Sequence, residues 1–372
     1  MEDLKPKTIK TIMLSGGGTG GSVTPLLALA EELIKEDKNI NLLFVGAKNG
    51  PEKELIAGFK DKEIRFLTLP SGKLRRYLSV YNFFDVFKIV GAFFKSLMIL
   101  RQEMPDIVIS AGSFVSVPLV WAAACRRIPI LIHQQDIRPG LANKLMAPFA
   151  RVITVTFEKS LADYGPRAVL TGNPAKDISS FQSQGMNMRK KYNLKIDVPF
   201  VFVVGGGTGA LAINKLVAES LPDLLPFCQI INLTGHNKKP SDTVKNETDS
   251  GTYQAIEFLA HDEYLGLLAA ADLVVSRCGL GALTEISALA KAAILIPMPH
   301  SHQEDNAFLF RDREAAIVLN QDSLSAKELG DKIKIVLGDS KLRGSLSRNA
   351  AKIMKPEAAG NMAALIWEII KK

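Results

Sequence analysis

One short pattern occurs twice in this chain, and it constrains the fold more than any other feature. Near the start, an apolar strand, a glycine-rich turn at 16–21 and an apolar-periodic helix are predicted for the segment TIMLSGGGTGGSVTPLLALAEEL. From residue 199, the segment PFVFVVGGGTGALAINKLVAESL repeats this order, with its turn at 205–209. Each half of the chain is therefore predicted to open its own α/β domain in the same way.

Short apolar runs and amphipathic helices alternate after both turns. The runs are NLLFVGA, DIVISAG and IPILIHQ in the first half, and QIINLTG, ADLVVSRCG and AAILIPM in the second. Buried strands separated by helices are typical of parallel sheets with βαβ crossovers. We therefore expect two Rossmann-like, doubly wound parallel-sheet domains that face a cleft, with the ligand at the carboxyl ends of the strands.

The chain has 372 residues, which is more than one hydrophobic core usually serves. Glycine, asparagine and proline interrupt the pattern in the stretch LTGNPAKD at 170–177. This places the predicted domains at 1–171 and 172–372. A last helix at 358–372 has a clear apolar stripe, and the sequence leaves open whether it stays with the second domain or packs back on the first.

Charge and cysteine usage limit the partners. Lysine and arginine number 46 against 38 acidic residues, a formal charge of +8. This excess suits an anionic partner such as a nucleotide, a phospholipid surface or a pyrophosphate lipid. Three scattered cysteines without a CxxC pair indicate reduced thiols, with neither a disulfide framework nor a zinc site. The apolar stretch at the N-terminus is short and runs into glycines, so it predicts a strand and not a signal peptide.

The segment FFDVFKIVGAFFKSLMIL at 83–100 is long enough to cross a bilayer. However, Asp85, Lys88 and Lys95 interrupt it at helical spacing, which places them on one face. An amphipathic helix, either buried or interfacial, is the prediction.

A glycine turn between a strand and a helix lets the backbone approach a phosphate, and the helix N-terminus supplies N–H donors. Neither turn here is a P-loop, because no GK[ST] follows, and neither is a GxGxxG fingerprint with an acidic residue about twenty positions on. One such turn alone could simply serve close helix packing. Two matching turns on two matching domains favour a phosphate or pyrophosphate ligand.

Two polar stretches in the second half extend this prediction. The segment SRCGLGALTE at 276–285 again leads from a strand into a helix, and the Glu285 carboxylate could accept hydrogen bonds from two vicinal hydroxyls, as on a ribose. Alternatively, Glu285 is only a favourable charge near a helix N-terminus. The segment PHSHQEDNA at 299–307 carries the donors and acceptors that sugar recognition requires. Its two histidines lack further ligands nearby, so no metal site is expected.

In order and spacing, these residues resemble the MurG family of peptidoglycan N-acetylglucosaminyltransferases over nearly the whole chain. The resemblance is carried by GGTGG-x-V-x-P at 17–25, SAGSFVSVP at 110–118, HQQD at 133–136, GLANK at 140–144, GNP at 172–174, GGGTGA at 205–210, EFL at 257–259, 277–285 and HQE at 302–304.

The resemblance implies a GT-B fold and inverting transfer, without a metal or another cofactor, of N-acetylglucosamine from UDP-N-acetylglucosamine. The acceptor would be the MurNAc of lipid I, undecaprenyl-pyrophosphoryl-MurNAc-pentapeptide, and the product lipid II. The second domain would bind the donor through Gly206, Gly207, Thr208, Leu259, Arg277, Glu285, Gln303 and Glu304. The first would bind the acceptor and its pyrophosphate through Gly17, Gly18, Thr19, Gly20, Gly21, Asn143, Asn173 and Lys176. No nucleic-acid partner is implied.

The resemblance also implies a peripheral position at the cytoplasmic face of the bacterial inner membrane. A basic cluster followed by the amphipathic helix is similar to the family's membrane-association patch and fits an anionic membrane surface. The residues concerned are Lys73, Arg75, Arg76, Phe84 and Phe87. A solvated charge run beside a core helix is the alternative.

The chain departs from the family pattern at the presumed base. Ser22 stands where the family usually has the histidine that is favoured as proton acceptor, and a serine hydroxyl is too weak a base near neutral pH. The family's usual His-Glu-x-Asn appears here as HQQD, so Asp136 replaces an amide. We therefore expect Asp136 to be the general base, with Ser22 as a hydrogen-bonding positioner.

Three other functions stay open at this point. The donor and fold could serve another lipid-linked acceptor, since Ser22 and Asp136 both lie on the acceptor side. The chain could bind UDP-sugar without turnover. A sugar-nucleotide epimerase also uses two such domains, although the membrane patch and the acceptor-side motifs weigh against it.

Overall fold

The computed structural model describes residues 9–18, 20–48, 50, 52–59, 63–70, 80–206, 209–238 and 252–371, and for 80–87 only the backbone. The chain forms two compact units, one of residues 1–176 and 355–372 and the other of residues 177–354. The first unit thus ends a few residues beyond the expected boundary, and the last helix belongs to it.

The first unit is built on a sheet of seven parallel strands within the described residues. In spatial order they are β3 (Arg65–Leu69), β2 (Asn41–Ala47), β1 (Thr11–Ser15), β4 (Ile107–Ser110), β5 (Ile130–Gln134), β6 (Val152–Val155) and β7 (Ala168–Leu170). Successive side chains of a strand point to opposite faces. In β1, Met13 enters one core and its neighbours Ile12 and Leu14 enter the other, so both faces of the sheet are covered.

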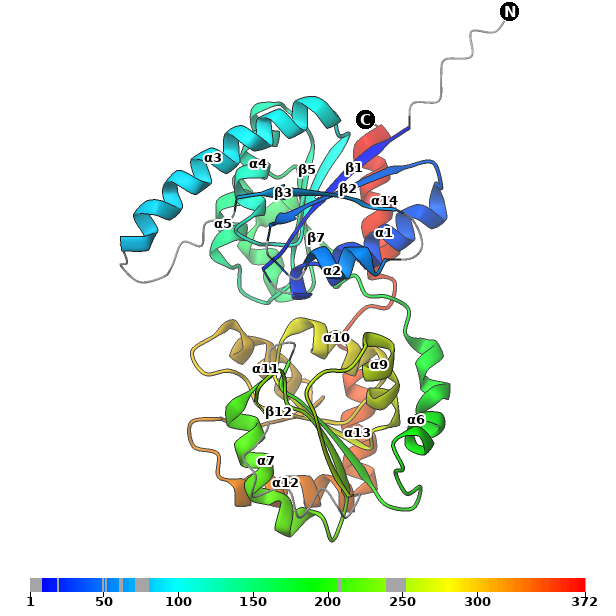
Figure 1. Cartoon of the computed structure of the whole chain (residues 1–372). Coiled ribbons are helices and arrows are strands. Elements are labelled where there is room, and N and C mark those ends of the chain that lie inside the picture. The colour runs from blue at the N-terminus through cyan, green and yellow to red at the C-terminus, as the bar shows by residue number, and fades with distance from the viewer. Residues whose placement is uncertain are drawn as a thin grey trace, which may run out of the picture. The chain divides into compact units, whose positions relative to one another are not determined.

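Helices form the two outer layers of the first unit (Figure 1). The cores place α3 (Val80–Glu103), α4 (Ser116–Cys125) and α5 (Leu141–Met146) on one face, and α1 (Thr24–Glu36), α2 (Glu52–Ala57) and α14 (Ala358–Lys371) on the other. Short 3-10 turns complete the unit: η1 (Gly20–Ser22), η2 (Ala147–Phe149), η3 (Glu158–Asp163) and η4 (Gly165–Arg167).

Helix α14 packs beside α1, although more than three hundred residues separate them in the chain (Figure 1). Its stripe of Met362, Ala363, Ile366 and Ile369 is buried in the same core as the α1 leucines. The apolar periodicity of this helix therefore serves the first unit, because that sheet face would otherwise lack half of its cover.

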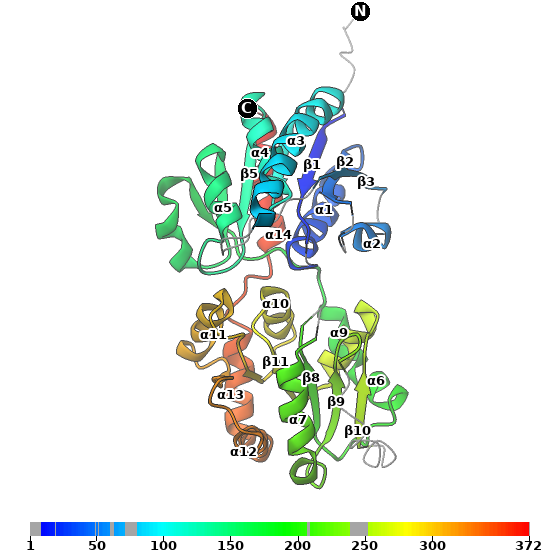
Figure 2. The same ribbon diagram turned by 60° about the vertical axis from the view of Figure 1, so that its left-hand side comes forward.

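In the part of the chain that the structure describes, the second unit repeats the arrangement with six parallel strands. Their spatial order is β10 (Tyr253–Ile256), β9 (Gln229–Leu233), β8 (Phe200–Val204), β11 (Leu273–Ser276), β12 (Ala293–Leu295) and β13 (Ile317–Val318). The helical elements are η5 (Ser179–Gln184), α6 (Gly185–Lys191), α7 (Leu211–Leu224), α9 (His261–Ala270), α10 (Leu280–Ala288), α11 (His302–Asp312), α12 (Ala326–Gly338) and α13 (Ser340–Ala350). Helices α7 and α12 cover one face, and α6 and α9 pack together beyond the other (Figure 2).

Each sheet reverses its strand order once, between β1 and β4 in the first unit and between β8 and β11 in the second. Ser15 pairs with Ser110 across the first reversal, and Val204 pairs with Ser276 across the second. The loops that follow these residues consequently leave the sheet side by side, at the place where doubly wound sheets bind ligands. Both repeated glycine turns lie there.

The expected fold class, two doubly wound parallel-sheet α/β domains, is confirmed. The sequence pattern does not indicate β3, β6, β7, β10 or β13 individually. Four of these are sheet edges, where side chains stay partly exposed and the apolar run is short or mixed with polar residues.

The amphipathic segment at 83–100 lies inside α3. Its core-facing side includes Ala92, Ser96 and Leu100, while Phe94 and Met98 are 61% and 64% exposed. Lys73, Arg75 and Arg76 lie outside the described residues, as do the side chains of Phe84 and Phe87. None of the described helices combines the length and the apolar character that a bilayer-spanning segment requires.

Candidate functional site

The first glycine loop follows β1 and is closed by its own serine. The Ser22 hydroxyl accepts a hydrogen bond from the Gly17 amide (2.9 Å) and donates one to the Gly17 carbonyl (3.1 Å). Gly18 has φ +79°, a conformation that a side chain would strain. The turn η1 with Gly20 and Gly21 then leads into α1, while Thr19 lies outside the described residues. Ser22 therefore shapes the loop both as a hydrogen-bond acceptor and as a donor.

A buried carboxylate supports the same loop from outside the glycine motif. Glu52, the first residue of α2, is fully buried and accepts hydrogen bonds from the amides of Ala47 (2.6 Å) and Gly18 (3.2 Å). Sequence reasoning missed this residue. A glutamate at the start of a short helix usually faces solvent, so its type and position carry no signal of the pairing.

Across the strand reversal, Asn143 on α5 lies beside the loop after β4. Its Nδ2 donates to the carbonyl of His133 (3.3 Å) and to Oε1 of Gln134 (2.6 Å). Its Oδ1 is buried near Gly112 and has no hydrogen-bond partner among the described residues. A buried acceptor without a partner is uncommon and marks a place where a ligand or water can donate.

Gln134 holds the turn that carries Asp136. Its Nε2 donates to the carbonyls of Asp136 (2.6 Å) and Arg138 (3.1 Å), and its Oε1 also accepts from the hydroxyl of Tyr164 (2.9 Å). Asp136 itself is half-buried, two residues beyond the end of β5. Tyr164 is a second residue that the sequence did not indicate, because it lies on a separate 3-10 turn, η3–η4, thirty residues away.

His133 connects the strands of the first unit to the stretch that leaves it. Its Nε2 donates to Oδ1 of Asn173 (3.1 Å), and its Nδ1 lies 3.0 Å from Oγ1 of Thr154. Burial lowers the pKa of His133 to about 4, so the imidazole is neutral at physiological pH. Lys176, three residues beyond Asn173, forms an ion pair with Glu31 on α1 (3.1 Å). Both predicted acceptor residues therefore fix this stretch to the first unit.

In the second unit, the glycine loop after β8 is held by a backbone hydrogen bond and by Lys238, whose Nζ donates to the Gly209 carbonyl (3.2 Å). Gly206 has φ +82°, and its carbonyl accepts from the Gly209 amide (2.9 Å). A Cβ at Gly205 would collide with the backbone of Gly209 and Ala210. Among the described residues, no side chain caps helix α7, whose N-cap is Ala210, so its first amides are available to an anion. Gly207 and Thr208 lie outside the described residues.

Arg277 and Gln303 hold the loop on the other side of this reversal. The Arg277 guanidinium donates to the carbonyls of Ile296 (3.0 Å) and Pro297 (2.9 Å) and to the side chain of Gln321. Oε1 of Gln303 accepts from the amides of Cys278 (3.2 Å) and Met298 (3.1 Å). These two predicted donor-side residues thus connect the loop after β11 to the loop after β12.

Glu304 and Leu259 complete the predicted donor-side set. Glu304 is half-buried in the first turn of α11, whose N-cap is Ser301. Leu259 is buried just after β10, and its neighbour Phe258 is 74% exposed. Both positions follow the carboxyl ends of strands in the second sheet.

Glu285 on α10 is paired with a residue from α9. The Tyr264 hydroxyl donates to Oε2 of Glu285 (2.8 Å). Burial of the carboxyl group raises the pKa of Glu285 to about 7, and the tyrosine hydrogen bond opposes that rise. The sequence indicated Glu285 but not Tyr264, because α9 and α10 are separated by a strand.

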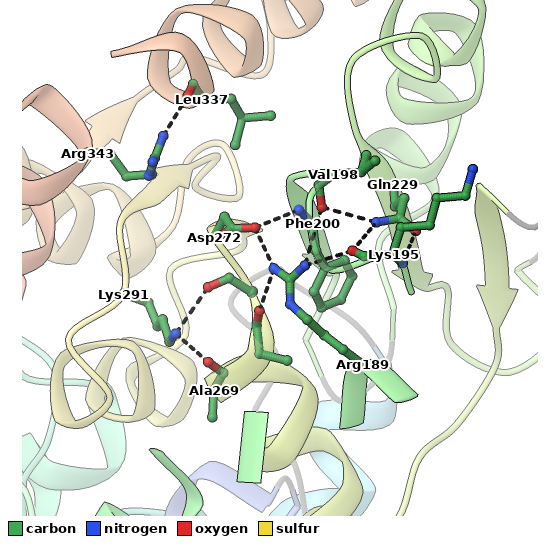
Figure 3. A network of polar contacts seen from close by, with 12 residues as sticks. Arg189, Lys195, Val198, Phe200, Gln229, Ala269, Asp272, Lys291, Leu337 and Arg343 are labelled. Atoms are coloured by element: carbon green, nitrogen blue, oxygen red, sulfur yellow. Dashed lines mark hydrogen bonds and ion pairs between the residues drawn. The ribbon is translucent and has the colours of Figure 1, made fainter. Parts of the chain in front are cut away.

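The opposite, amino-terminal edge of the second sheet is a closed polar network (Figure 3). Arg189 donates to Oδ2 of Asp272 (2.6 Å) and to the carbonyls of Ala270, Lys195 and Val198. Asp272 also accepts from the amide of Phe200, where β8 begins (2.8 Å). These polar groups bind one another and fix the strand starts, whereas the predicted ligand-binding residues lie toward the carboxyl edge.

A doubly wound sheet in each unit, each with a glycine turn at its strand reversal, defines a two-domain enzyme of the GT-B class. The glycosyltransferase family 28 N-terminal domain matches residues 12–155, and the family 28 C-terminal domain matches residues 200–361. The chain belongs to glycosyltransferase family 28.

Individual relatives agree with this assignment. The UDP-N-acetylglucosamine--N-acetylmuramyl-(pentapeptide) pyrophosphoryl-undecaprenol N-acetylglucosamine transferase of Clostridium kluyveri is 35% identical over 88% of this chain and 91% of its own length. Among solved structures, Acinetobacter baumannii MurG has a TM-score of 0.71 at 24% identity, covering 96% of this chain and 99% of that one. The resemblance to the MurG family is confirmed.

A Neisseria meningitidis UDP-GlcNAc 2-epimerase bound to UDP-GlcNAc has almost the same structural similarity. Its TM-score is 0.69 at 12% identity, covering 97% of this chain and all of the other. The fold alone therefore does not separate a transferase from an epimerase, and the sequence relatives make that distinction.

Proposed function

We propose that this chain transfers N-acetylglucosamine from UDP-N-acetylglucosamine to the MurNAc of lipid I, forming lipid II for peptidoglycan synthesis. The observation that carries the proposal is similarity over nearly the full length to transferases named for this reaction, at 34–35% identity. That similarity spans both sheets and both glycine loops. The activity therefore belongs to cell wall biogenesis, with its accompanying links to cell shape and division.

The second unit binds the donor in this proposal. Glu285 accepts from the ribose hydroxyls, and the amides of the 205–209 loop and of α7 face the diphosphate, since an uncapped helix N-terminus favours an anion. Leu259 holds the uracil through its backbone, and Glu304 holds the sugar. The side chains of Arg277 and Gln303 are engaged with backbone groups, so they act chiefly by shaping the loop around the ligand.

The first unit binds the acceptor. Its pyrophosphate lies near the 16–21 loop. Oδ1 of Asn143, which has no hydrogen-bond partner among the described residues, accepts from the acceptor. Asn173 and Lys176 hold the chain segment that leaves this unit. Ser22 supports the loop through its two hydrogen bonds with Gly17. It does not take the proton, because a serine hydroxyl is a weak base near neutral pH.

Asp136 is the general base in the proposed reaction. Its carboxylate takes the proton of the attacking MurNAc hydroxyl while that oxygen forms a bond to the anomeric carbon of the donor. The bond from this carbon to the diphosphate breaks, UDP leaves with the electron pair, and the configuration inverts. Backbone amides and the helix dipole stabilise the charge that develops on the diphosphate, so no metal is required.

Helix α3 supports peripheral attachment to the cytoplasmic face of the bacterial inner membrane. Val90, Phe94 and Met98 form an exposed apolar row at helical spacing, with the lysines Lys88 and Lys95 also exposed on this helix. An apolar row next to basic side chains suits insertion among anionic headgroups. Replacing both Phe94 and Met98 with serine should reduce binding to anionic vesicles and leave UDP binding unchanged.

The first experiment combines purified protein, labelled UDP-N-acetylglucosamine and a short-chain lipid I analogue, and follows UDP release and labelled disaccharide. Disaccharide formation supports the proposal. Donor binding without transfer favours another lipid-linked acceptor or a binder without turnover, and isomerised UDP-sugar in a donor-only incubation favours an epimerase.

The same assay tests the base. Asp136→Asn should lower kcat about 10²-fold or more, the usual contribution of general base catalysis, with unchanged UDP affinity. Near-normal turnover in this variant would rule Asp136 out. Ser22→Ala is the matched control, and it should keep a measurable rate with the same pH profile as the wild type.

A further inference from the structure

The tyrosine that binds Glu285 is held firmly in place. The Tyr264 ring packs against Phe202 of β8 with 5.8 Å between ring centroids, and His261 stacks on it at 6.1 Å. Helix α9 begins at His261, just after the predicted uracil-binding residue Leu259. The hydroxyl of Tyr264 is therefore carried by the same loop and helix start that lie beside the proposed nucleoside.

The hydrogen bond from Tyr264 uses one of the two carboxylate oxygens of Glu285. Oε2 accepts from the tyrosine at 2.8 Å, whereas for Oε1 no partner occurs in the part of the chain that the structure describes. Two vicinal hydroxyls of a ribose can then donate to this second oxygen. The hydrogen bond at Oε2 restricts the rotation of the carboxylate and so favours one orientation of Oε1.

Two effects act on the charge of Glu285 in opposite directions. Burial raises the pKa of Glu285, and the Tyr264 hydrogen bond lowers it. Burial and the nearby carboxylate hold the pKa of Tyr264 well above its usual value, so the hydroxyl remains a donor.

Two charged side chains on the neighbouring helices bind other groups. On α9, Glu263 pairs with Lys191, and on α13, Arg343 donates to the carbonyls of Val336 and Leu337. His261 is the titratable group that stacks on Tyr264. It is therefore the group that must be controlled for in any pH measurement.

We propose that Tyr264 is a positioning residue of the donor site, whose hydroxyl fixes Glu285 as the hydrogen-bond acceptor for the ribose of the UDP-sugar. This inference rests on the proposed function, which assigns Glu285 to the ribose. Tyr264 acts through Glu285: its hydrogen bond favours the charged carboxylate. A carboxylate accepts stronger hydrogen bonds from the ribose than a neutral carboxyl group does. Removing the hydroxyl should therefore move the pH at which UDP affinity rises to a higher value, and not simply lower the affinity at every pH.

The test measures UDP affinity by calorimetry between pH 6 and 9 for the full-length wild type, Tyr264→Phe and Glu285→Gln. Wild-type affinity should rise as pH increases through about 7, where Glu285 loses its proton. In Tyr264→Phe, this rise should move to higher pH, with affinity about 3- to 10-fold lower at pH 7 and nearly restored at pH 9. Glu285→Gln should bind about tenfold more weakly and lack the rise. Titration of the UDP phosphate is common to all variants and cancels in their ratios.

Each possible failure has a separate signature. If Glu285→Gln binds UDP as the wild type does, the ribose assignment in the proposed function is wrong. If Glu285→Gln is weak but Tyr264→Phe keeps the wild-type midpoint, or loses affinity equally at every pH, the positioning role is wrong. His261→Asn should keep the wild-type midpoint of the pH dependence of UDP affinity. If the pH dependence disappears in this variant, it belongs to the imidazole, and the proposal is overturned.

Discussion

The amino edges of the two sheets use the same device, whereas their carboxyl edges are built differently. At each amino edge, an aspartate just ahead of the strand after the reversal accepts a hydrogen bond from the first amide of the central strand. Asp106 binds Thr11 (2.7 Å), and Asp272 binds Phe200 (2.8 Å). At the carboxyl edges, the first glycine loop is held by the side chains of Ser22 and Glu52. In the described part of the second, the Gly209 amide donates to Gly206, and a lysine, Lys238, donates to the Gly209 carbonyl.

This difference separates what maintains the fold from what meets the ligands. The aspartate fixes the start of a central strand, which both units need whatever they bind. The loops have different expected ligands, a lipid-linked pyrophosphate in one unit and a nucleoside diphosphate in the other. A change at an amino edge should therefore alter stability, and a change at a carboxyl edge should alter binding.

The largest effect is expected at the amino edge of the second sheet. Asp272→Ala leaves the nearly buried Arg189 guanidinium without its counter-charge and should lower the free energy of unfolding by about 3 kcal/mol. Urea unfolding measures this loss, and UDP affinity below the transition should stay within about twofold of the wild type. Asp106→Ala is the matched control, with a smaller loss because its partner Lys10 is more exposed. A large loss of UDP affinity in the Asp272 variant would show that the amino edge also affects binding, contrary to the comparison.

His133 lies near the carboxyl edge of the first sheet, but its replacement should alter stability, as changes at the amino edge do. It stays neutral in the folded protein down to pH about 4, while an unfolded imidazole takes up a proton near 6.5. Between these values the unfolded state binds more protons, so stability falls as the pH falls, by about 3 kcal/mol from this group. The free energies of unfolding of the wild type and His133→Asn are measured from pH 7 to 4. The difference between them should shrink by about this amount as the pH falls. A constant difference between the two proteins would contradict the prediction.

Glu52 tests whether the first glycine loop depends on its side-chain support. Glu52→Ala leaves the amides of Ala47 and Gly18 without their acceptor and should lower the free energy of unfolding by about 2 kcal/mol. In the transfer assay, KM for the lipid I analogue should rise, while the UDP dissociation constant should not change. An equal change for both substrates would show that the two loops are not independent.

The smallest effect is expected from a methyl group in the second loop. Gly205→Ala places a Cβ against the backbone of Gly209 and Ala210, so the loop must shift and UDP affinity should fall about tenfold. Gly338→Ala, whose added Cβ meets open space at the end of α12, should leave UDP affinity unchanged. Calorimetry with UDP compares the two variants, and equal affinities would remove the loop from the donor site.

The repeated strand–turn–helix pattern predicted both sheets and the place of both loops, because apolar periodicity and glycine turns are local signals. It could not predict that Glu52 binds Gly18, 34 residues away, or that Tyr264 binds Glu285, 21 residues away, because both contacts are made only through tertiary packing. The same limit applies to Arg277 and Gln303. The family resemblance suggested ligand contacts for both, whereas folding places carbonyl and amide groups of the backbone within their reach.

Helix α14 has a consequence for synthesis on the ribosome. The second unit is an insertion between Lys176 and Lys355, so all of its residues emerge before the helix that completes the first unit. The later unit in the sequence can finish folding first, while one face of the earlier sheet waits, partly uncovered, for Met362 and Ile366. During that interval the unfinished first unit offers an apolar surface to chaperones and to other nascent chains.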